Sequence, residues 1–304
     1  MARVACSTWN GGGNVAVFRA LAERLRARGH DVSLKIDHTT PPDLDGDVLL
    51  VDVMTSVAGL EAVRASGKPA ALIVHTMWSF APSLDGTFFP PGWFDVARRF
   101  EHLLVFGIES VDAATDVPPG VRWVGPVLEP EGPDAGWLPP ARSLVVVGMG
   151  TTDMGEAPVE DPLHDGLAAA PVDVVVTLGE HLDASSFRVP GNAELRGFTR
   201  HAALLPHADV FVGHAGLGGI MASLAFGVPM VLVPLDRDQP HNAARVAAAG
   251  AARVVDKGAA PEAIAAAVDA VRTGVTERTR AIELANAIAG YGDAAVTSVE
   301  ALLR

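Results

Sequence analysis

The sequence has a single cysteine, and its acidic residues outnumber its basic ones. Cys6 alone cannot form an intramolecular disulfide or a cysteine-based zinc site, which fits a reducing compartment. The 23 Lys and Arg residues stand against 36 Asp and Glu residues, giving a formal net charge of −13. Because nucleic acids and anionic membrane surfaces are bound through clustered cations, this balance argues against both as partners. Any phosphate that the chain binds must be held locally.

Long apolar runs are also missing. No apolar stretch reaches the roughly 20 residues that a bilayer-spanning helix needs before a charge or a proline interrupts it. Residues 1–9 lack the basic-then-apolar order of a secretory signal. From these absences we expect a cytoplasmic protein without a membrane span.

What is present predicts an α/β protein of two domains. The chain has 304 residues, more than one domain usually holds, and its hydrophobic content of 49% can fill sizeable cores. Residues 1–130 and 143–304 each alternate short apolar runs with helix-like segments, the pattern of a parallel sheet. The proline-rich residues 131–142 are typical of a linker. We therefore expect two Rossmann-like domains facing a cleft, and leave open whether the last helix crosses back to the first domain.

The segment HAGLGG, residues 214–219, lies where an apolar strand passes into a helix. In a parallel sheet, ligands bind beyond the carboxyl ends of the strands, where the first turn of the next helix presents unpaired N–H groups. Such a turn suits a diphosphate, and His214 adds a hydrogen bond. Alternatively, His214 is a hydrogen-bonded core residue, and Gly216, Gly218 and Gly219 only permit close packing of the strand and the helix.

The turn after the next strand is rich in polar side chains. Asp236, Asp238, Gln239 and Asn242 follow that strand at the same rim of the sheet. Asp238 and Gln239 offer acceptors and donors side by side, as the binding of several sugar hydroxyls requires. The alternative is that Asp238 caps the helix that begins near Pro240.

Residues 214–255 resemble the donor-sugar signature of the UDP-glycosyltransferase-like family of the GT-B fold, particularly its bacterial natural-product enzymes. The family pattern is His-Gly-Gly-His-Gly-Thr, an alanine-rich helix, Gly-Val-Pro, a short strand, and Asp-Gln with a following Asn. Here the corresponding stretches are HAGLGG, MASLAFGVP and DQPHN. Weaker similarity covers nearly all of the chain, from GGGNVAVFRALAERLRARGHDV to NAELRGFTRHAALLPHADVFV.

This resemblance implies a GT-B fold and an enzyme: an inverting, metal-independent glycosyltransferase. It would move a hexose or deoxysugar from a nucleoside-diphosphate sugar to a small-molecule, natural-product acceptor. The diphosphate would be held by His214, by the N–H groups of Gly216, Gly218 and Gly219, and by Thr151 from a neighbouring turn.

The resemblance also implies ligands for the rest of the donor. Phe198 falls where the family stacks an aromatic ring on the base, and Arg200 follows it. Asp238 and Gln239 would orient the sugar. The segment LDRD has the spelling of a metal-binding Asp-x-Asp motif, but in the family this segment binds sugar. We therefore expect no metal and no cofactor, with a dTDP-sugar or UDP-sugar as co-substrate.

Two positions depart from the family pattern. Gly219 replaces a Thr or Ser, so one hydroxyl contact to phosphate is missing. Asn14 stands where the family has its general base, and an amide does not accept a proton near neutral pH. Asn14 would then orient the acceptor, and His75 and Asp52, at the ends of apolar strands, are candidates for the proton transfer. Alternatively His75 is a packed strand-end residue, or the acceptor is acidic enough to need no base.

Two other function classes stay open, and the oligomeric state leaves no readable trace. A non-catalytic nucleotide-sugar binder or auxiliary partner is favoured by Asn14 and by the short first domain. An NAD-dependent oxidoreductase is suggested by GGGNVA, which spells Gly-x-Gly-x-x-Ala, with Asp37 at the end of the next strand. In the oxidoreductase hypothesis, however, residues 214–255 have no role.

Overall fold

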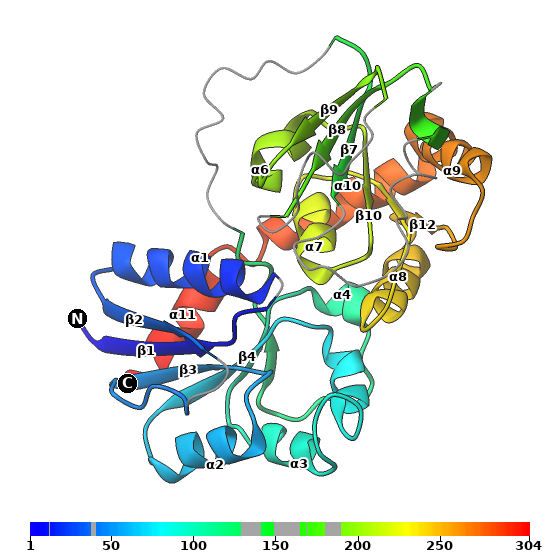
Figure 1. Ribbon diagram of the computed structural model, residues 1–304. Coiled ribbons are helices and arrows are strands. Elements are labelled where there is room, and N and C mark those ends of the chain that lie inside the picture. The colour runs from blue at the N-terminus through cyan, green and yellow to red at the C-terminus, as the bar shows by residue number, and fades with distance from the viewer. Residues whose placement is uncertain (12, 38–40, 129–140, 149–164, 169, 180–189) are drawn as a thin grey trace. The chain divides into compact units, whose positions relative to one another are not determined.

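The computed structural model describes residues 1–11, 13–37, 41–128, 141–148, 165–168, 170–179 and 190–304. The chain divides into two compact units, the first formed by Met1–Glu129 with Tyr291–Arg304 and the second by Pro130–Gly290. In the described residues each unit contains a parallel sheet of six strands with helices between them (Figure 1). The predicted α/β class with two Rossmann-like domains is confirmed. Residues 131–140 of the predicted linker lie outside the described residues.

The sheet of the first unit has the strand order β2-β1-β3-β4-β5-β6. Its strands are β1 (Arg3–Thr8), β2 (Asp31–Ile36), β3 (Val48–Asp52), β4 (Ala70–Val74), β5 (Leu103–Val105) and β6 (Val121–Trp123). The helices of this unit are α1 (Asn14–Ala27), α2 (Val57–Ala65), α3 (Trp93–Ala97), α4 (Glu109–Asp112) and α11 (Ala294–Ala301), with the 3-10 helix η1 (Trp78–Leu84). All neighbouring strands run parallel.

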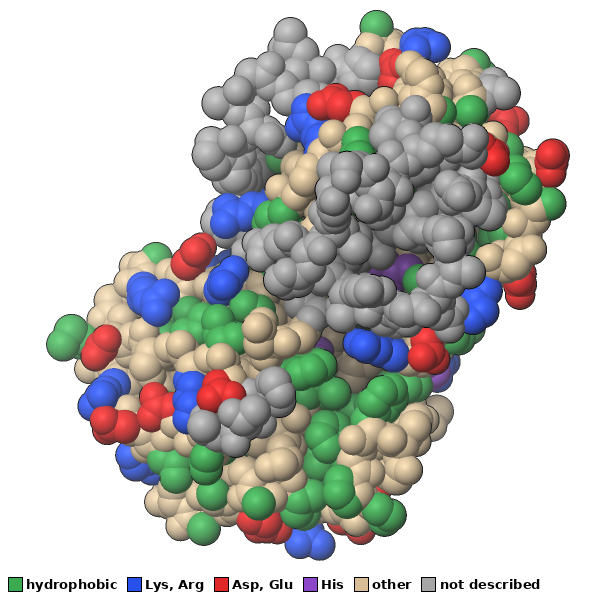
Figure 2. Space-filling view, in the orientation of Figure 1, with side chains coloured by type: hydrophobic (Ala, Val, Ile, Leu, Met, Phe, Trp, Pro, Cys, Tyr) green, Lys and Arg blue, Asp and Glu red, His purple; other side chains and the backbone are tan. Residues whose placement is uncertain are grey.

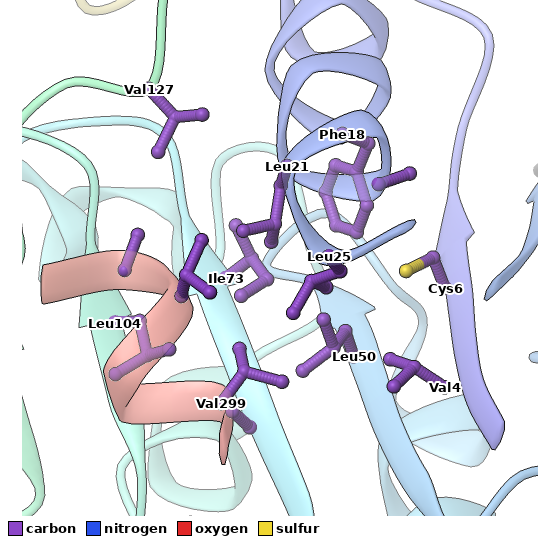
Figure 3. Close-up of a cluster of buried hydrophobic side chains, with 14 of the residues drawn as sticks. Val4, Cys6, Phe18, Leu21, Leu25, Leu50, Ile73, Leu104, Val127 and Val299 are labelled. Carbon is purple, nitrogen blue, oxygen red and sulfur yellow. The ribbon is translucent and has the colours of Figure 1, made fainter. Parts of the chain in front are cut away.

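The last helix of the chain, α11, completes the core of the first unit. Val299 of α11 is fully buried together with Leu21 and Leu25 of α1 and with Ile73 of β4 (Figure 3). The strands are apolar along nearly their whole length because each face of the sheet is covered by helices. Residues 291–304 therefore belong to the packing of the first unit, although they follow the second unit in sequence.

The sheet of the second unit has the strand order β12-β11-β10-β7-β8-β9. Its strands are β7 (Leu144–Gly148), β8 (Asp173–Thr177), β9 (Ala193–Arg196), β10 (Val210–Gly213), β11 (Met230–Leu232) and β12 (Ala252–Val254). Its helices are α6 (His201–Leu204), α7 (Leu217–Ala225), α8 (Gln239–Ala248), α9 (Pro261–Thr273) and α10 (Thr276–Ala289), with the 3-10 helix η3 (Leu205–His207).

Both sheets contain a point at which the strand order reverses. In the first unit the chain passes from β1 to β2 on one side and then places β3 on the other side of β1. In the second unit β8 and β9 extend from one side of β7, whereas β10 pairs with its other side. Ligands of parallel α/β sheets bind at the carboxyl ends of the strands that flank such a reversal. The fold thus marks β1 and β3, and β7 and β10, as the places to look for function.

The surface of the described residues shows no membrane-spanning element. None of the described helices is long and apolar enough to cross a bilayer.

On the face shown in Figure 2, acidic and basic side chains are interspersed, and hydrophobic side chains gather on the first unit around η1 and α3. Phe88, between those two helices, is 45% exposed.

Candidate functional site

Four side chains of the first unit meet where β1, β3 and β4 end. Thr8 ends β1, Asn14 begins α1, Asp52 ends β3 and His75 follows β4. Nε2 of His75 lies 2.8 Å from Oδ1 of Asp52, and the Asn14 amide donates to Oδ2 of the same carboxylate at 3.0 Å. The Thr8 hydroxyl donates to Oδ2 at 2.5 Å. The structure thus brings together the three predicted candidates of this unit and adds Thr8, which no sequence motif marked.

Asp52 is held ionised at this place. The side chain is buried, and burial acts to raise the pKa of its carboxyl group. The electrostatic effect of His75 and the hydrogen bonds from His75, Thr8 and the Met54 N–H act in the opposite direction, and they leave the pKa of Asp52 below its ordinary value. A histidine oriented by an ionised carboxylate is the arrangement in which an imidazole serves as a general base.

Asn14 is part of this network through its amide nitrogen. Nδ2 donates to Thr8 Oγ1 and to the Trp9 carbonyl oxygen, each at 2.9 Å, as well as to Asp52. Its Oδ1 is buried and has no hydrogen-bond partner among the residues that the structure describes. Asn14 therefore fixes the carboxylate of Asp52, and among these four side chains the imidazole of His75 is the group suited to accept a proton near neutral pH.

In the second unit, His214 lies at the reversal between β7 and β10. Its Nδ1 lies 3.4 Å from the carbonyl oxygen of Gly148, at the end of β7. A carbonyl only accepts, so Nδ1 carries the hydrogen and Nε2 is the other, acceptor nitrogen of the neutral ring. A Cβ built on Gly216 would come within 2.5 Å of that Nε2. Gly216 therefore lets the imidazole ring lie against the start of α7, whose first N–H groups have no acceptor within the helix.

Gly219 is also explained by packing. A Cβ at this position would lie 3.2 Å from the ring of Phe211, closer than ordinary contact. A threonine or serine here would press against the aromatic ring of β10. The departure of Gly219 from the family pattern is consistent with this crowding, and it leaves backbone N–H groups as the donors of the turn.

Replacement of Gly216 by alanine is expected to displace the His214 ring and to weaken UDP binding. The affinity should fall by about tenfold, because one charge-assisted hydrogen bond is lost. The backbone of Gly216, with φ −63° and ψ 138°, suits alanine, so the unit should fold normally. Isothermal titration with UDP measures the change. Gly191→Ala is the control, because its Cβ would meet nothing within 4 Å. Equal UDP affinity in both variants would contradict the assignment.

A second histidine, His201 of α6, lies beside His214. Its ring meets Phe211 edge-on at 5.2 Å, and its Nε2 lies 3.3 Å from Thr177 Oγ1. Burial and the neighbouring His214 lower the pKa of His201 to about 4, so it is neutral at pH 7. Burial also lowers the pKa of His214, against the opposing effects of the Gly148 hydrogen bond and the Asp238 charge. In the described residues, His214 without ligand is therefore a neutral imidazole at neutral pH.

When a diphosphate binds, His214 is expected to take up a proton. The affinity for the diphosphate should therefore fall as pH rises. A bound anion favours the imidazolium, and the pKa of His214 is lowered in the unliganded protein, so the affinity is highest at low pH and falls as pH rises; about pH 5 to 8 is the range to test. Titration of UDP across this range measures the effect. His214→Gln corrects for the titration of the terminal phosphate itself, and an identical pH profile in that variant would contradict proton uptake by His214.

The polar turn before α8 is held by its own side chains. Gln239 Oε1 accepts from the N–H groups of Leu235 and Asp236 at 2.8 and 3.2 Å. Asp238 makes no side-chain cap of α8, and its Oδ2 accepts from Asn242 Nδ2 at 3.0 Å. The capping alternative is therefore not what the structure shows. The side-chain oxygen of Gln239 already accepts these two backbone hydrogen bonds. Its amide nitrogen is then the atom that could bind a sugar hydroxyl.

The remaining predicted donor residues lie at the same edge of the second sheet or outside the described residues. Phe198 follows β9 and is 47% exposed, and Arg200 precedes α6. Thr151 lies outside the described residues. Within the described part of the chain, no group of three or more His, Cys, Asp or Glu side chains is placed to hold a metal ion.

Comparison with known sequences finds similarity over less than half of the chain. Residues 162–296 match the family model of the erythromycin biosynthesis protein CIII-like C-terminal domain. Over 144 residues, 45% of this chain, the sequence is 38% identical to 4'-demethylrebeccamycin synthase of Lentzea aerocolonigenes. The match covers 33% of that relative. The chain thus spans about a third of the length of this curated relative.

Comparison with solved structures covers both units. The glycotransferase of kitacinnamycin superimposes with a TM-score of 0.78 over 100% of this chain and 99% of its own, at 23% identity. Glycosyltransferase VinC, solved in complex with DTDP, gives a TM-score of 0.76 over 99% of each chain, at 16% identity. The chain has the GT-B fold, and its predicted resemblance to bacterial natural-product glycosyltransferases is confirmed.

Proposed function

Because this chain has the GT-B fold and its residues 162–296 match the erythromycin biosynthesis protein CIII-like domain, we propose that it is an inverting, metal-independent glycosyltransferase. It transfers a sugar from a nucleoside diphosphate to a small natural-product acceptor in the cytoplasm. The observation that carries the proposal is the position of His214 against the glycine-rich start of α7, beside the end of β7. This arrangement offers N–H dipoles and a cation-forming imidazole to a diphosphate.

The second unit stabilises the leaving group. As the bond between the anomeric carbon and the diphosphate breaks, its electron pair stays on the phosphate oxygen, and the charge develops near His214 and the N–H groups of Gly218 and Gly219. Donors oriented before the reaction stabilise such charge without a metal ion. In this proposal Phe198 stacks on the base, Arg200 contacts the nucleotide, and Asp238 and Gln239 orient the sugar. Thr151, which lies outside the described residues, is assigned to the diphosphate by the family resemblance alone.

The first unit activates the acceptor. The O–H or N–H group of the acceptor attacks the anomeric carbon of the sugar from the side opposite the diphosphate. The configuration at that carbon therefore inverts. The proton of the attacking group passes to His75, and the carboxylate of Asp52, 2.8 Å from the ring, balances the imidazolium. Asn14 keeps Asp52 in place. Hydrophobic side chains around η1 and α3 offer contact to an apolar acceptor (Figure 2).

The co-substrate is a UDP-sugar or dTDP-sugar, and no further cofactor is needed. A structure similar to this chain, VinC, was solved with DTDP, and 4'-demethylrebeccamycin synthase resembles nearly half of the chain. Both similarities support a nucleotide sugar and a natural-product acceptor. An oxidoreductase is not favoured, because Asn14 in the GGGNVA segment is used to hold Asp52.

The test is a transfer assay with purified full chain, UDP-glucose or dTDP-glucose, and a panel of phenolic, alcoholic and indole acceptors. Mass spectrometry is expected to find an acceptor that gains one hexose, and proton NMR to find a β-linkage from the α-linked donor. Saturable binding of UDP or dTDP without product from any pair would instead identify a non-catalytic binder. Binding of NAD in place of both nucleotides would support the oxidoreductase.

A further inference from the structure

Thr8, the last residue of β1, is buried between Asp52 and Asn14. Its hydroxyl oxygen lies 2.5 Å from Asp52 Oδ2 and 2.9 Å from Asn14 Nδ2. An amide nitrogen only donates, so the Thr8 oxygen accepts the hydrogen bond of Asn14. The single hydroxyl proton then goes to Asp52, because the other available acceptor, the carbonyl oxygen of Trp9, is 3.5 Å away. The direction of both hydrogen bonds is therefore fixed.

The carboxylate of Asp52 is surrounded by donors on both oxygens. Oδ2 accepts from Thr8 and Asn14, while Oδ1 accepts from the Met54 N–H at 2.7 Å and faces His75 Nε2. Donors on every side favour the anionic form and hold the group in one orientation. An ionised carboxylate only accepts, so His75 donates from Nε2. The lone pair of the neutral ring is consequently on Nδ1.

Resting on the proposed sugar transfer, we infer that Thr8 is a positioning residue whose hydroxyl orients Asp52, so that Asp52 holds the His75 ring with its hydrogen on Nε2 for the proton transfer. Thr8 acts through Asp52, since its hydroxyl bonds to Asp52 and Asn14 in the described residues. The titratable side chain that faces Asp52 there is His75, from the segment after β4. Thr8 of β1 and Asn14 of α1 are neutral side chains, so neither of them competes with His75 for a proton.

The decisive variant is Thr8→Val, which keeps the shape of the side chain and removes the hydroxyl. Asp52 loses one donor, and its carboxylate then binds a proton more strongly. With UDP-glucose or dTDP-glucose, kcat is expected to fall by about tenfold to a hundredfold with KM for the donor unchanged. The acidic limb of the pH–rate profile is expected to move upward by about one pH unit. Thr8→Ser restores the hydroxyl and should restore both values.

A second readout does not depend on turnover. Nitrogen-15 NMR of the histidine-labelled full chain, with the His75 signals assigned through His75→Gln, reports which ring nitrogen carries the proton. The wild type and Thr8→Ser should show neutral His75 protonated on Nε2, and Thr8→Val a mixture of tautomers. If Thr8→Val does not fold, Thr8→Cys, a weaker donor, should give an intermediate mixture.

The outcomes separate the two claims. A wild-type chain that transfers no sugar overturns the proposed function, whatever the tautomer of His75. Sugar transfer by the wild type with the same kcat, pH profile and tautomer in Thr8→Val overturns the role of Thr8 alone.

Discussion

Replacement of His75 by alanine is expected to lower kcat by about 10²–10⁴-fold, the contribution of a positioned general base. In the proposed mechanism the His75 imidazole accepts the proton. Thr8 and Asn14, which also bond to Asp52 in the described residues, cannot replace it because both are neutral at any working pH. The affinity for UDP should stay unchanged, because His214 and the start of α7 belong to the second unit. Initial rates with the best donor and acceptor of the transfer assay measure the effect.

His102→Ala is the matched control in the same unit and should retain full turnover. Asp52→Asn is expected to reproduce much of the loss, because an amide at this place cannot balance the imidazolium. Full activity of His75→Ala would exclude His75 as the base. It would favour an acceptor acidic enough to react without one.

Replacement of His214 by alanine is expected to weaken UDP and dTDP binding by tenfold or more, which corresponds to at least about 1.4 kcal/mol. In the proposed function the His214 imidazole supplies a charged donor to the bound diphosphate, and a hydrogen bond to a charged group contributes about 1.5–3 kcal/mol. Turnover should fall as well, because the same contact stabilises the leaving group. Isothermal titration and initial rates measure the two effects.

The glutamine variant separates charge from hydrogen bonding. His214→Gln keeps a neutral N–H donor and should bind UDP with an affinity between those of the wild type and His214→Ala. Unchanged affinity in the alanine variant would place the diphosphate elsewhere.

The pattern of the sequence was sufficient to predict the sheets and the glycine-rich turn. The strands were recognisable because strands covered on both faces are apolar throughout, as in the LVVVG of β7 and the VLLVD of β3. His214 was recognisable because a histidine and three glycines between a strand and a helix form a local motif. Local sequence, however, could not predict that α11 packs on the first unit, since its Ala and Val residues would suit either sheet.

The contacts within the candidate site could not be predicted in the same way. His75 and Asp52 are 23 positions apart, and their contact depends on β3 and β4 being neighbours, which only the sheet topology settles. Thr8 gave no signal, because a strand-end threonine is common and its role depends on two partners distant in sequence. Gln239 is predicted from the sequence to bind sugar. The sequence did not indicate that its side-chain oxygen accepts hydrogen bonds from the N–H groups of Leu235 and Asp236.

The most direct measurement of the central claim is a crystal structure of the full chain with bound dTDP. The account predicts the diphosphate at the start of α7, with oxygens within hydrogen-bond distance of His214 Nε2 and of the N–H groups of Gly218 and Gly219. A diphosphate bound beside Gly11 at the start of α1, with the α7 site occupied by the protein's own side chains, would contradict it.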